Sequence, residues 1–186
     1  MKYHRRGELS ALDCPPKCNK NPFMPKKPSA ARSLDAFDRQ ILRIVQRDNK
    51  TPQRVIAEAV HLSAAAVQRR IAAMEQAGVI RANVALVDPD ALAVAITAIV
   101  EVFLRDERTE SIDRAKALFR STPEVQQCYY TTGGTSFVLV ILTPDMRAYE
   151  ALTRSLFSDH EWVASFRTLV ALDRVKSGTG VVVPPV

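Results

Sequence analysis

The chain has 186 residues, of which 47% are hydrophobic and 25% are charged, values typical of an ordinary globular protein. No stretch approaches the roughly 18 consecutive apolar residues that a membrane-spanning helix needs. The three cysteines, an odd number, argue against a disulfide scaffold and favour the reducing cytoplasm.

The formal net charge of +6 is spread unevenly along the chain. Residues 1–33 carry +6, residues 34–87 carry +3 and residues 88–186 carry −3. A basic N-terminal half joined to an acidic C-terminal half is typical of a nucleic-acid-binding module beside a module with another task. The alternative is a charged surface that serves only to interact with solvent.

Residues 1–33 are predicted to be a disordered basic tail, because they are rich in Pro and Lys and show no apolar periodicity. Met24 is a candidate for an internal translation start. Lys26, Lys27 and Arg32 indicate either an arm that follows the DNA backbone or a solubilising tail.

Residues 34–87 are predicted to form a winged helix-turn-helix. Apolar residues at helical spacing predict one helix up to about Asp48 and another over residues 51–60, which Thr51 would cap. A tight turn at His61 leads to a third helix, which Ser63 caps and Gly78 ends. Two short strands, residues 79–82 and 83–87, would form the wing, and Asp88-Pro89 marks the domain boundary.

The third helix has the character of a recognition helix. Val67, Ile71 and Met74 recur at inward-facing spacing, which leaves a slim outward face that suits the major groove. Arg69 would contact a guanine edge or a phosphate, unless it is only a solvated charge, and Gln68 would read adenine. Arg70 would either contact phosphate or pair with an acid such as Glu58. The predicted DNA-binding residues are Ser63, Ala64, Ala65, Gln68, Arg69 and Arg70.

Residues 88–186 alternate between strand and helix patterns in the order β-α-β-β-α-β, which predicts an α+β, ferredoxin-like sandwich. Residues 180–183 would add an edge strand. A sheet with both helices on one face leaves the other face bare, and Ile99, Val138 and Val170 are expected on it. A second copy is the simplest cover, so we predict a homodimer. The strands are expected at 92–105, 125–132, 137–143 and 163–173, and the helices at 110–121 and 145–157.

Several fragments in this order resemble the leucine-responsive/AsnC (Lrp/AsnC, feast/famine) family of transcriptional regulators. The resemblance implies a sequence-specific DNA-binding regulator, assembly of dimers into tetramers or octamers, and a C-terminal (RAM-type) domain that senses a small molecule such as an amino acid. The matching fragments are LDAFDRQILRIVQRD at 34–48, LSAAAVQRRIAAMEQAGVI at 62–80, TPDMRAY at 143–149 and RTLVALDRVK at 167–176.

Two positions depart from the family pattern. His61 stands where the family usually has Gly, which is tolerable because His enters positive φ more readily than most residues. The family's effector loop commonly reads G-D-x-D-Y, and the resemblance places it at Gly133, Gly134, Thr135 and Ser136. Both acids are missing, so no carboxylate is available for an ammonium group. We therefore expect an atypical effector or none.

No catalytic or metal-binding set emerges, and we expect no enzyme activity and no cofactor. His4, His61 and His160 are scattered, and Cys14 and Cys18 with His4 lack the fourth ligand of a structural zinc site. Cys128 is expected to be a buried, inert thiol. The alternative function is a sirohaem-decarboxylase-like enzyme, or a small-molecule-binding module, with a vestigial helix-turn-helix. Sirohaem-decarboxylating relatives tend to carry a Tyr-x-Arg-x-x-His cluster where this chain reads CYYTT.

Overall fold

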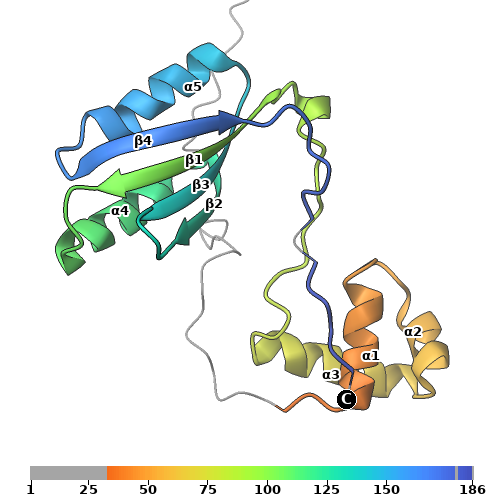
Figure 1. Ribbon diagram of the computed structural model, residues 1–186. Coiled ribbons are helices and arrows are strands. Elements are labelled where there is room, and N and C mark those ends of the chain that lie inside the picture. Colours follow the sequence, from red (N-terminus) through yellow and green to blue (C-terminus); the bar gives the residue numbers. More distant parts are fainter. Residues whose placement is uncertain (1–32, 179, 186) are drawn as a thin grey trace, which may run out of the picture. The chain divides into compact units, whose positions relative to one another are not determined.

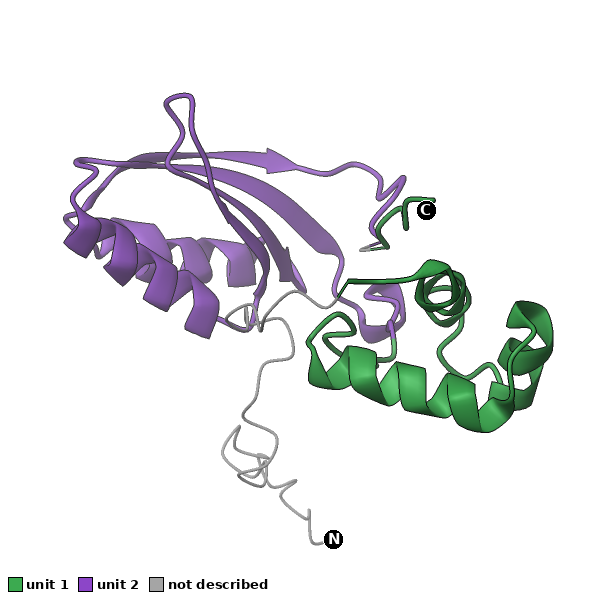
Figure 2. Cartoon of the chain, turned by 90° about the horizontal axis from the view of Figure 1, so that it is seen from below, with its two compact units in different colours: residues 1–85, 179–186 green, residues 86–178 purple. Residues whose placement is uncertain are grey.

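The computed structural model describes residues 33–178 and 180–185, which form two compact units (Figures 1 and 2). Unit 1 comprises residues 1–85 together with 179–186, and unit 2 comprises residues 86–178. The division differs from the expected boundary at 87/88 chiefly because residues 179–186 belong to unit 1. Residues 1–32 and the interpretations made on them, including the Cys14–Cys18 pair, lie outside the described residues.

Unit 1 is a bundle of three helices, α1 (Ala36–Val45), α2 (Gln53–Val60) and α3 (Ala64–Gln76). Side chains cap two of them: the Asp38 amide donates to Asp35 Oδ1 over 2.8 Å, and the Ala66 amide donates to Ser63 Oγ over 3.2 Å. Helix α2 begins after Pro52 without a side-chain cap, so the cap predicted at Thr51 is wrong. The buried core is Ile41, Ile56, Ala57, Val60, Val67 and Met74.

The segment after α3 is extended but forms no strand, so the hairpin predicted over residues 79–87 is wrong. Gly78, with a φ of +73°, ends the helix as expected, and the amides of Val79 and Ile80 both donate to the Met74 carbonyl. Val79 and Ile80 pack against the core of unit 1, but Val84 and Leu86 are 42% and 82% exposed, so the second half of the segment finds no apolar surface. An isolated two-stranded ribbon is only marginally stable without such a surface.

Unit 2 contains a four-stranded antiparallel sheet in the order β2-β3-β1-β4, with α4 and α5 on one face (Figure 1). This is the ferredoxin-like arrangement that the sequence predicts. A short 3₁₀ turn, Asp90–Leu92, precedes β1, and a π turn, Arg154–Ser158, extends α5. The elements are β1 (Ile96–Leu104), α4 (Thr109–Ser121), β2 (Val125–Tyr130), β3 (Phe137–Thr143), α5 (Met146–Thr153) and β4 (Val163–Val170).

The core of unit 2 lies between the sheet and its two helices. Phe119 of α4 is fully buried, and its ring meets those of Phe137, Phe157 and Trp162 edge to face. Alternate residues of β3 are buried, as the period of a strand with one covered face requires. None of the described helices is both long enough and apolar enough to span a bilayer.

The opposite face of the sheet is open and largely apolar. Ile99 of β1 lies opposite Leu169 of β4 and Val140 of β3, and it is 37% exposed. Val170 is not on this face: it lies opposite the fully buried Ala98, and paired residues share a face. The placement predicted for Val170 is therefore wrong by one residue, because a bulge opposite Phe103 and Leu104 shifts the alternation of β4 by one position after the buried Val163.

Candidate nucleic-acid interface and sensing domain

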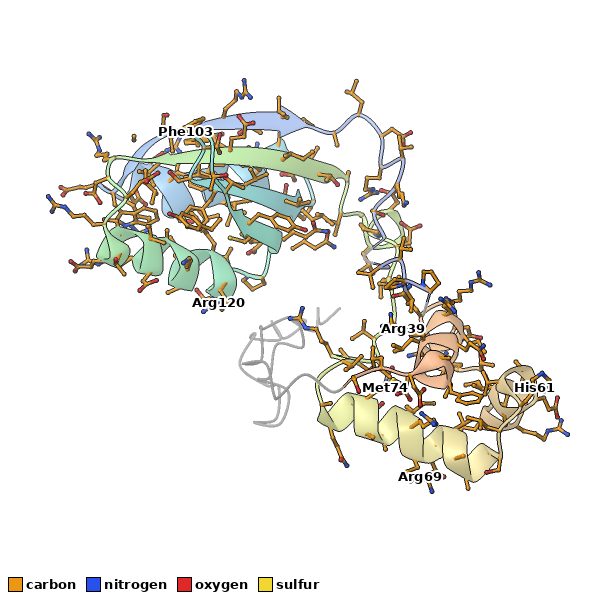
Figure 3. The ribbon with its side chains drawn as sticks, turned by 60° about the horizontal axis from the view of Figure 1, so that its bottom comes forward. Arg39, His61, Arg69, Met74, Phe103 and Arg120 are labelled. Atoms are coloured by element: carbon orange, nitrogen blue, oxygen red, sulfur yellow. The ribbon has the colours of Figure 1, made fainter. Side chains whose placement is uncertain are left out.

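The outward face of α3 is exposed and partly cationic. Ser63, Ala64, Ala65, Gln68 and Arg69 are all exposed, whereas Val67 and Met74 are fully buried. Figure 3 shows Arg69 on the outward side of the helix. Small side chains with one Gln and one Arg leave the helix narrow enough to enter a major groove and able to form bidentate hydrogen bonds there.

The neighbouring Arg70 is used inside the domain. Its Nη1 lies 2.7 Å from Asp35 Oδ2 and 2.8 Å from Asp38 Oδ1, and its guanidinium lies over the Phe37 ring at 5.5 Å from the centroid. Asp38 is almost fully buried, so this pair joins α3 to the first turn of α1. Of the two outcomes that the sequence left open, the structure shows pairing with an acid. The partner suggested there, Glu58, instead lies 4.0 Å from Arg54.

The charges around Arg70 shift two pKa values. The pKa of Asp35 lies below its ordinary value, first because the Asp38 amide donates to its carboxylate and then because Arg70 does. The pKa of Arg70 is raised, chiefly by its hydrogen bonds to Asp38 and Asp35. Arg70 is therefore a permanent cation held in place by two carboxylates.

The turn between α2 and α3 has the backbone conformation that the family resemblance implies. His61 lies in the left-handed region with φ 54° and ψ 44°, and the Leu62 amide donates to the Ala57 carbonyl over 3.0 Å. Non-glycine residues rarely adopt this conformation, although His does so more readily than most. The structure confirms that His61 adopts the positive φ that His was expected to tolerate at this position.

In unit 2, the four residues at the effector-loop position lie between β2 and β3. Gly133 and Gly134 have φ values of +96° and +101°, a conformation that favours glycine. Thr131 Oγ1 donates to the Thr135 carbonyl over 2.6 Å, which closes the loop. Ser136 is buried, and its Oγ accepts the Leu104 amide over 3.1 Å, where the pairing of β1 with β4 shifts register. The Ser136 hydroxyl therefore serves the sheet.

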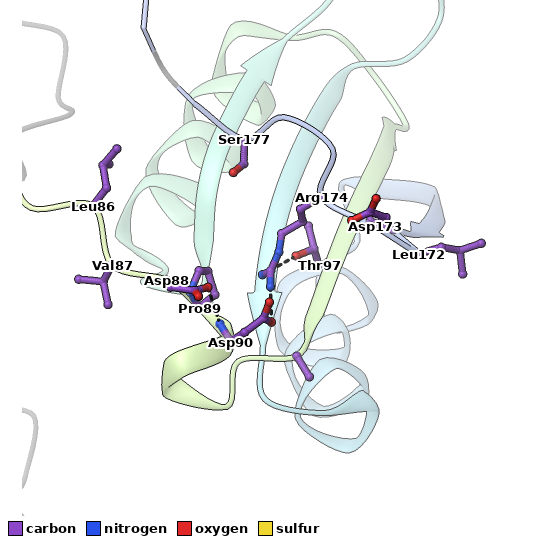
Figure 4. A pocket seen from close by; sticks show the side chains of 12 residues that line it. Leu86, Val87, Asp88, Pro89, Asp90, Thr97, Leu172, Asp173, Arg174 and Ser177 are labelled. Carbon is purple, nitrogen blue, oxygen red and sulfur yellow. Dashed lines mark hydrogen bonds and ion pairs between the residues drawn. The ribbon is translucent and has the colours of Figure 1, made fainter. Parts of the chain in front are cut away.

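A separate polar cavity of about 500 Å³ opens at the base of unit 2, where the chain enters and leaves this unit (Figure 4). Asp88, Asp90 and Asp173 line it together with Arg174, which sequence reasoning did not single out. The Arg174 guanidinium pairs with Asp90 and donates to Thr97 Oγ1 over 3.4 Å. The ion pair thus joins the segment before β1 to the segment after β4.

Cys128 lies at the surface of β2, so its predicted burial is wrong. The sulfur itself is partly shielded from water, and this desolvation raises the pKa of the thiol to about 11, against the opposing effect of the nearby Arg120 and Lys116 charges. The thiol is consequently protonated at neutral pH. The described residues contain no group of three or more His, Cys, Asp or Glu side chains that could hold a metal ion.

A three-helix domain with an exposed Gln/Arg helix face, joined to a ferredoxin-like domain, defines a two-domain DNA-binding protein. Comparison with known proteins supports this class and narrows it. Residues 34–81 match the family described as winged helix-turn-helix DNA-binding, and residues 97–181 match the Lrp/AsnC ligand binding domain. The HTH-type transcriptional regulator y4tD of Sinorhizobium fredii is 40% identical over 147 residues, which cover 79% of this chain and 87% of that protein.

Other relatives and solved structures agree. The leucine-responsive regulatory protein of Salmonella typhimurium is 27% identical, with 84% of this chain and 96% of that protein covered. An AsnC family regulator from Agrobacterium tumefaciens superimposes with a TM-score of 0.74 at 31% identity, covering 80% of this chain and 96% of that one. A regulator from Neisseria meningitidis in complex with L-Met also gives 0.74, at 27% identity and the same coverage.

The chain belongs to the Lrp/AsnC family of helix-turn-helix transcriptional regulators. The relatives named here are regulators, which does not favour the alternative of a sirohaem-decarboxylase-like enzyme.

Proposed function

We propose that α3 is the recognition helix and that Gln68 and Arg69 read base edges in the major groove. Both side chains are exposed, and the small residues Ala64 and Ala65 lie one turn before Gln68 and Arg69, which lets the helix approach the bases closely. The exposed Ser63, at the N-terminus of α3, suits a phosphate. The observation that carries the proposal is the contrast between the two adjacent arginines: one is engaged by carboxylates and one is exposed.

Arg70 is then a positioning residue rather than a DNA contact. Its two carboxylate partners hold α3 against α1, which keeps the recognition helix in one orientation before DNA arrives. Such preorganisation lowers the entropy lost on binding.

The test is binding to DNA from upstream of the protein's own gene, across a series of salt concentrations. Replacing Arg69 with Ala should weaken selective binding by about 5- to 150-fold, since a bidentate base contact contributes about 1–3 kcal/mol of discrimination. Arg69→Lys keeps the charge but not the planar fork, so it should restore the salt dependence without the selectivity. Arg114→Ala, an exposed arginine on α4 paired only with Glu110, is the matched control. Equal binding by Arg69→Ala and native protein would refute the assignment.

We further propose that two copies pair through the open face of the sheet. The exposed apolar side chains of Ile99 and Leu169 flank one ion pair, in which Arg167 Nε donates to Glu101 Oε2 over 2.6 Å. A charge at the centre of a buried apolar interface is costly, so Ile99→Glu should yield monomers in analytical ultracentrifugation. Leu172→Glu, at a fully exposed position outside the strands, should leave the assembly unchanged.

We propose that an effector, if the protein has one, binds at the loop Gly133–Ser136. The Neisseria regulator was solved with L-Met, but this loop offers no carboxylate for an ammonium group. We propose that the chain responds to an atypical effector or to none, catalyses no reaction, and works in the cytoplasm, where its DNA lies. Micromolar binding of ordinary amino acids in a calorimetric titration would refute the effector hypothesis.

A further inference from the structure

The helix α1 has a polar side that sequence analysis left unused. Arg39, Arg43 and Gln46 lie about 140–160° around the helix from the buried Ile41, at about 100° per residue. They therefore form one ridge on the side of α1 that faces away from the unit 1 core. Figure 3 shows Arg39 and Arg69 on opposite sides of this unit.

This ridge holds the C-terminal segment Val181–Pro184 by its backbone. Gln46 Nε2 donates to the Val181 carbonyl over 2.7 Å, while the Val181 amide donates to Gln46 Oε1 over 3.2 Å. The Gln46 amide thus pairs with Val181 as a peptide group of a neighbouring strand would. Arg43 Nη2 donates to the carbonyls of Val183 and Pro184 over 3.2 and 3.1 Å, and Arg39 Nη1 donates to the Pro184 carbonyl over 3.3 Å.

The composition of the segment fits this mode of binding. Pro184 and Pro185 have no amide hydrogen to leave unsatisfied, and their fixed φ favours an extended chain with outward carbonyls. Val182 is 92% exposed and contributes little packing, whereas Val183 is partly buried. The edge strand predicted at residues 180–183 is therefore wrong: the segment is extended, but its partners are side chains of α1.

The docked segment gives unit 2 a second connection to unit 1. The chain enters unit 2 at residue 86 and leaves it at residue 178, so both ends of the sensing domain continue into the DNA-binding domain. At the base of unit 2, the pair between Arg174 and Asp90 joins the two connecting segments (Figure 4). A covalent connection together with a docked segment limits the relative motion of two domains more than the covalent connection alone does.

We propose that the ridge of Arg39, Arg43 and Gln46 is a docking surface for an extended peptide, that its occupant is the chain's own segment Val181–Pro184, and that this contact tethers the DNA-binding domain to the sensing domain. The tether lies on the side of α1 away from α3 and therefore leaves the recognition face free. Its effect on DNA rests on the proposed function; its docking does not.

Docking is tested by amide hydrogen exchange of the C-terminal peptide in the full-length protein. The Arg43→Ala/Gln46→Ala variant should exchange several-fold faster at residues 181–183 than native protein, because the Val181 amide loses its acceptor and the segment is released. The matched control is Gln40→Ala/Arg47→Ala, which removes the same residue types from exposed positions in α1 and just after its end, neither of which bonds to the segment in the described structure. Unprotected exchange in the native protein would overturn the proposal.

The consequence is tested by DNA binding of the same variants. A released tether lets the DNA-binding domain sample more orientations, so selective affinity should fall several-fold while the salt dependence stays unchanged. Tighter binding with a steeper salt dependence would mean that the segment masks Arg39 and Arg43 from phosphates, which overturns the tether. If no variant binds DNA selectively, the proposed function fails, and the exchange measurement still decides whether the segment docks.

Discussion

The outward face of α3 and the loop at Gly133–Ser136 are the two places where the family resemblance predicts contact with another molecule, and they differ in what their side chains are free to do. On α3, Gln68 and Arg69 are exposed. In the loop, Ser136 is buried and its hydroxyl oxygen accepts a hydrogen bond from the Leu104 amide. A resemblance at a loop therefore transfers function less safely than one at a helix face, because the loop's polar groups also have to hold its own backbone.

The largest expected effect on stability separates Arg70 from Arg69. Arg70→Ala leaves the buried Asp38 carboxylate without its guanidinium, and we expect a loss of about 2 kcal/mol of unfolding free energy, reduced from the value of a fully buried pair because Arg70 is partly exposed. Arg69→Ala should change stability by no more than about 0.5 kcal/mol. Urea denaturation measures both. Equal losses would show that the two arginines do not differ in role.

The loop gives the next largest effect. Ser136→Ala removes the acceptor of the Leu104 amide and should cost about 1–2 kcal/mol, because that amide is partly buried beside the register shift. Ser177→Ala, at an exposed position, is the control. If thermal unfolding of Ser136→Ala matches that of the control, the hydroxyl is free for a ligand after all.

Placing the family's acid back in the loop tests whether the missing carboxylate is the reason why this loop would not bind ordinary amino acids. Gly134 has a φ of +101° and open space where a Cβ would stand, so Gly134→Asp meets strain but no clash. The expected cost is about 1 kcal/mol, at the lower end for a strained backbone, because Asp enters positive φ more readily than most residues. A stable Gly134→Asp variant that binds ordinary amino acids in calorimetry would mean that the missing carboxylate alone explains the effector difference.

The Asp35 carboxylate at the N-terminus of α1 predicts that folding stability depends on pH only in the acid range. The folded pKa of Asp35 is depressed, so its contribution to stability is fully present above the ordinary aspartate pKa and is lost as pH falls through the lower, folded value. Urea midpoints measured from neutral pH downward should decline in the native protein below about pH 4. Asp35→Asn should flatten part of that decline. The effect is small because Asp35 is largely exposed.

The smallest effect concerns the turn. His61→Gly relieves a left-handed φ but adds freedom to the unfolded chain, so the net gain should be about 0.5 kcal/mol or less. His61→Val should instead lose about 1 kcal/mol, because a β-branched residue is poorly tolerated there. Thermal denaturation of the pair decides whether the turn is strained.

The sequence by itself determined the three helices of unit 1 and the β-α-β-β-α-β order of unit 2, because each of these elements depends on local chemistry. Helical periodicity located α1 and α3, Ser63 and Gly78 marked the ends of α3, and the apolar run after the Gly133-Gly134 turn located β3 with its bounds. Among the site residues, the exposure of Arg69 followed from the same periodicity.

Only the tertiary structure decided which partners the long side chains bind and which extended segments pair with other elements. Arg70 pairs with Asp35 and Asp38, more than 30 residues earlier in the chain. Gln46 binds Val181, which lies 135 residues later in the chain. The wing lacks its strands and Val170 lies on the covered face for the same reason. Such contacts depend on register and distance between elements far apart in the chain, and no local pattern encodes them.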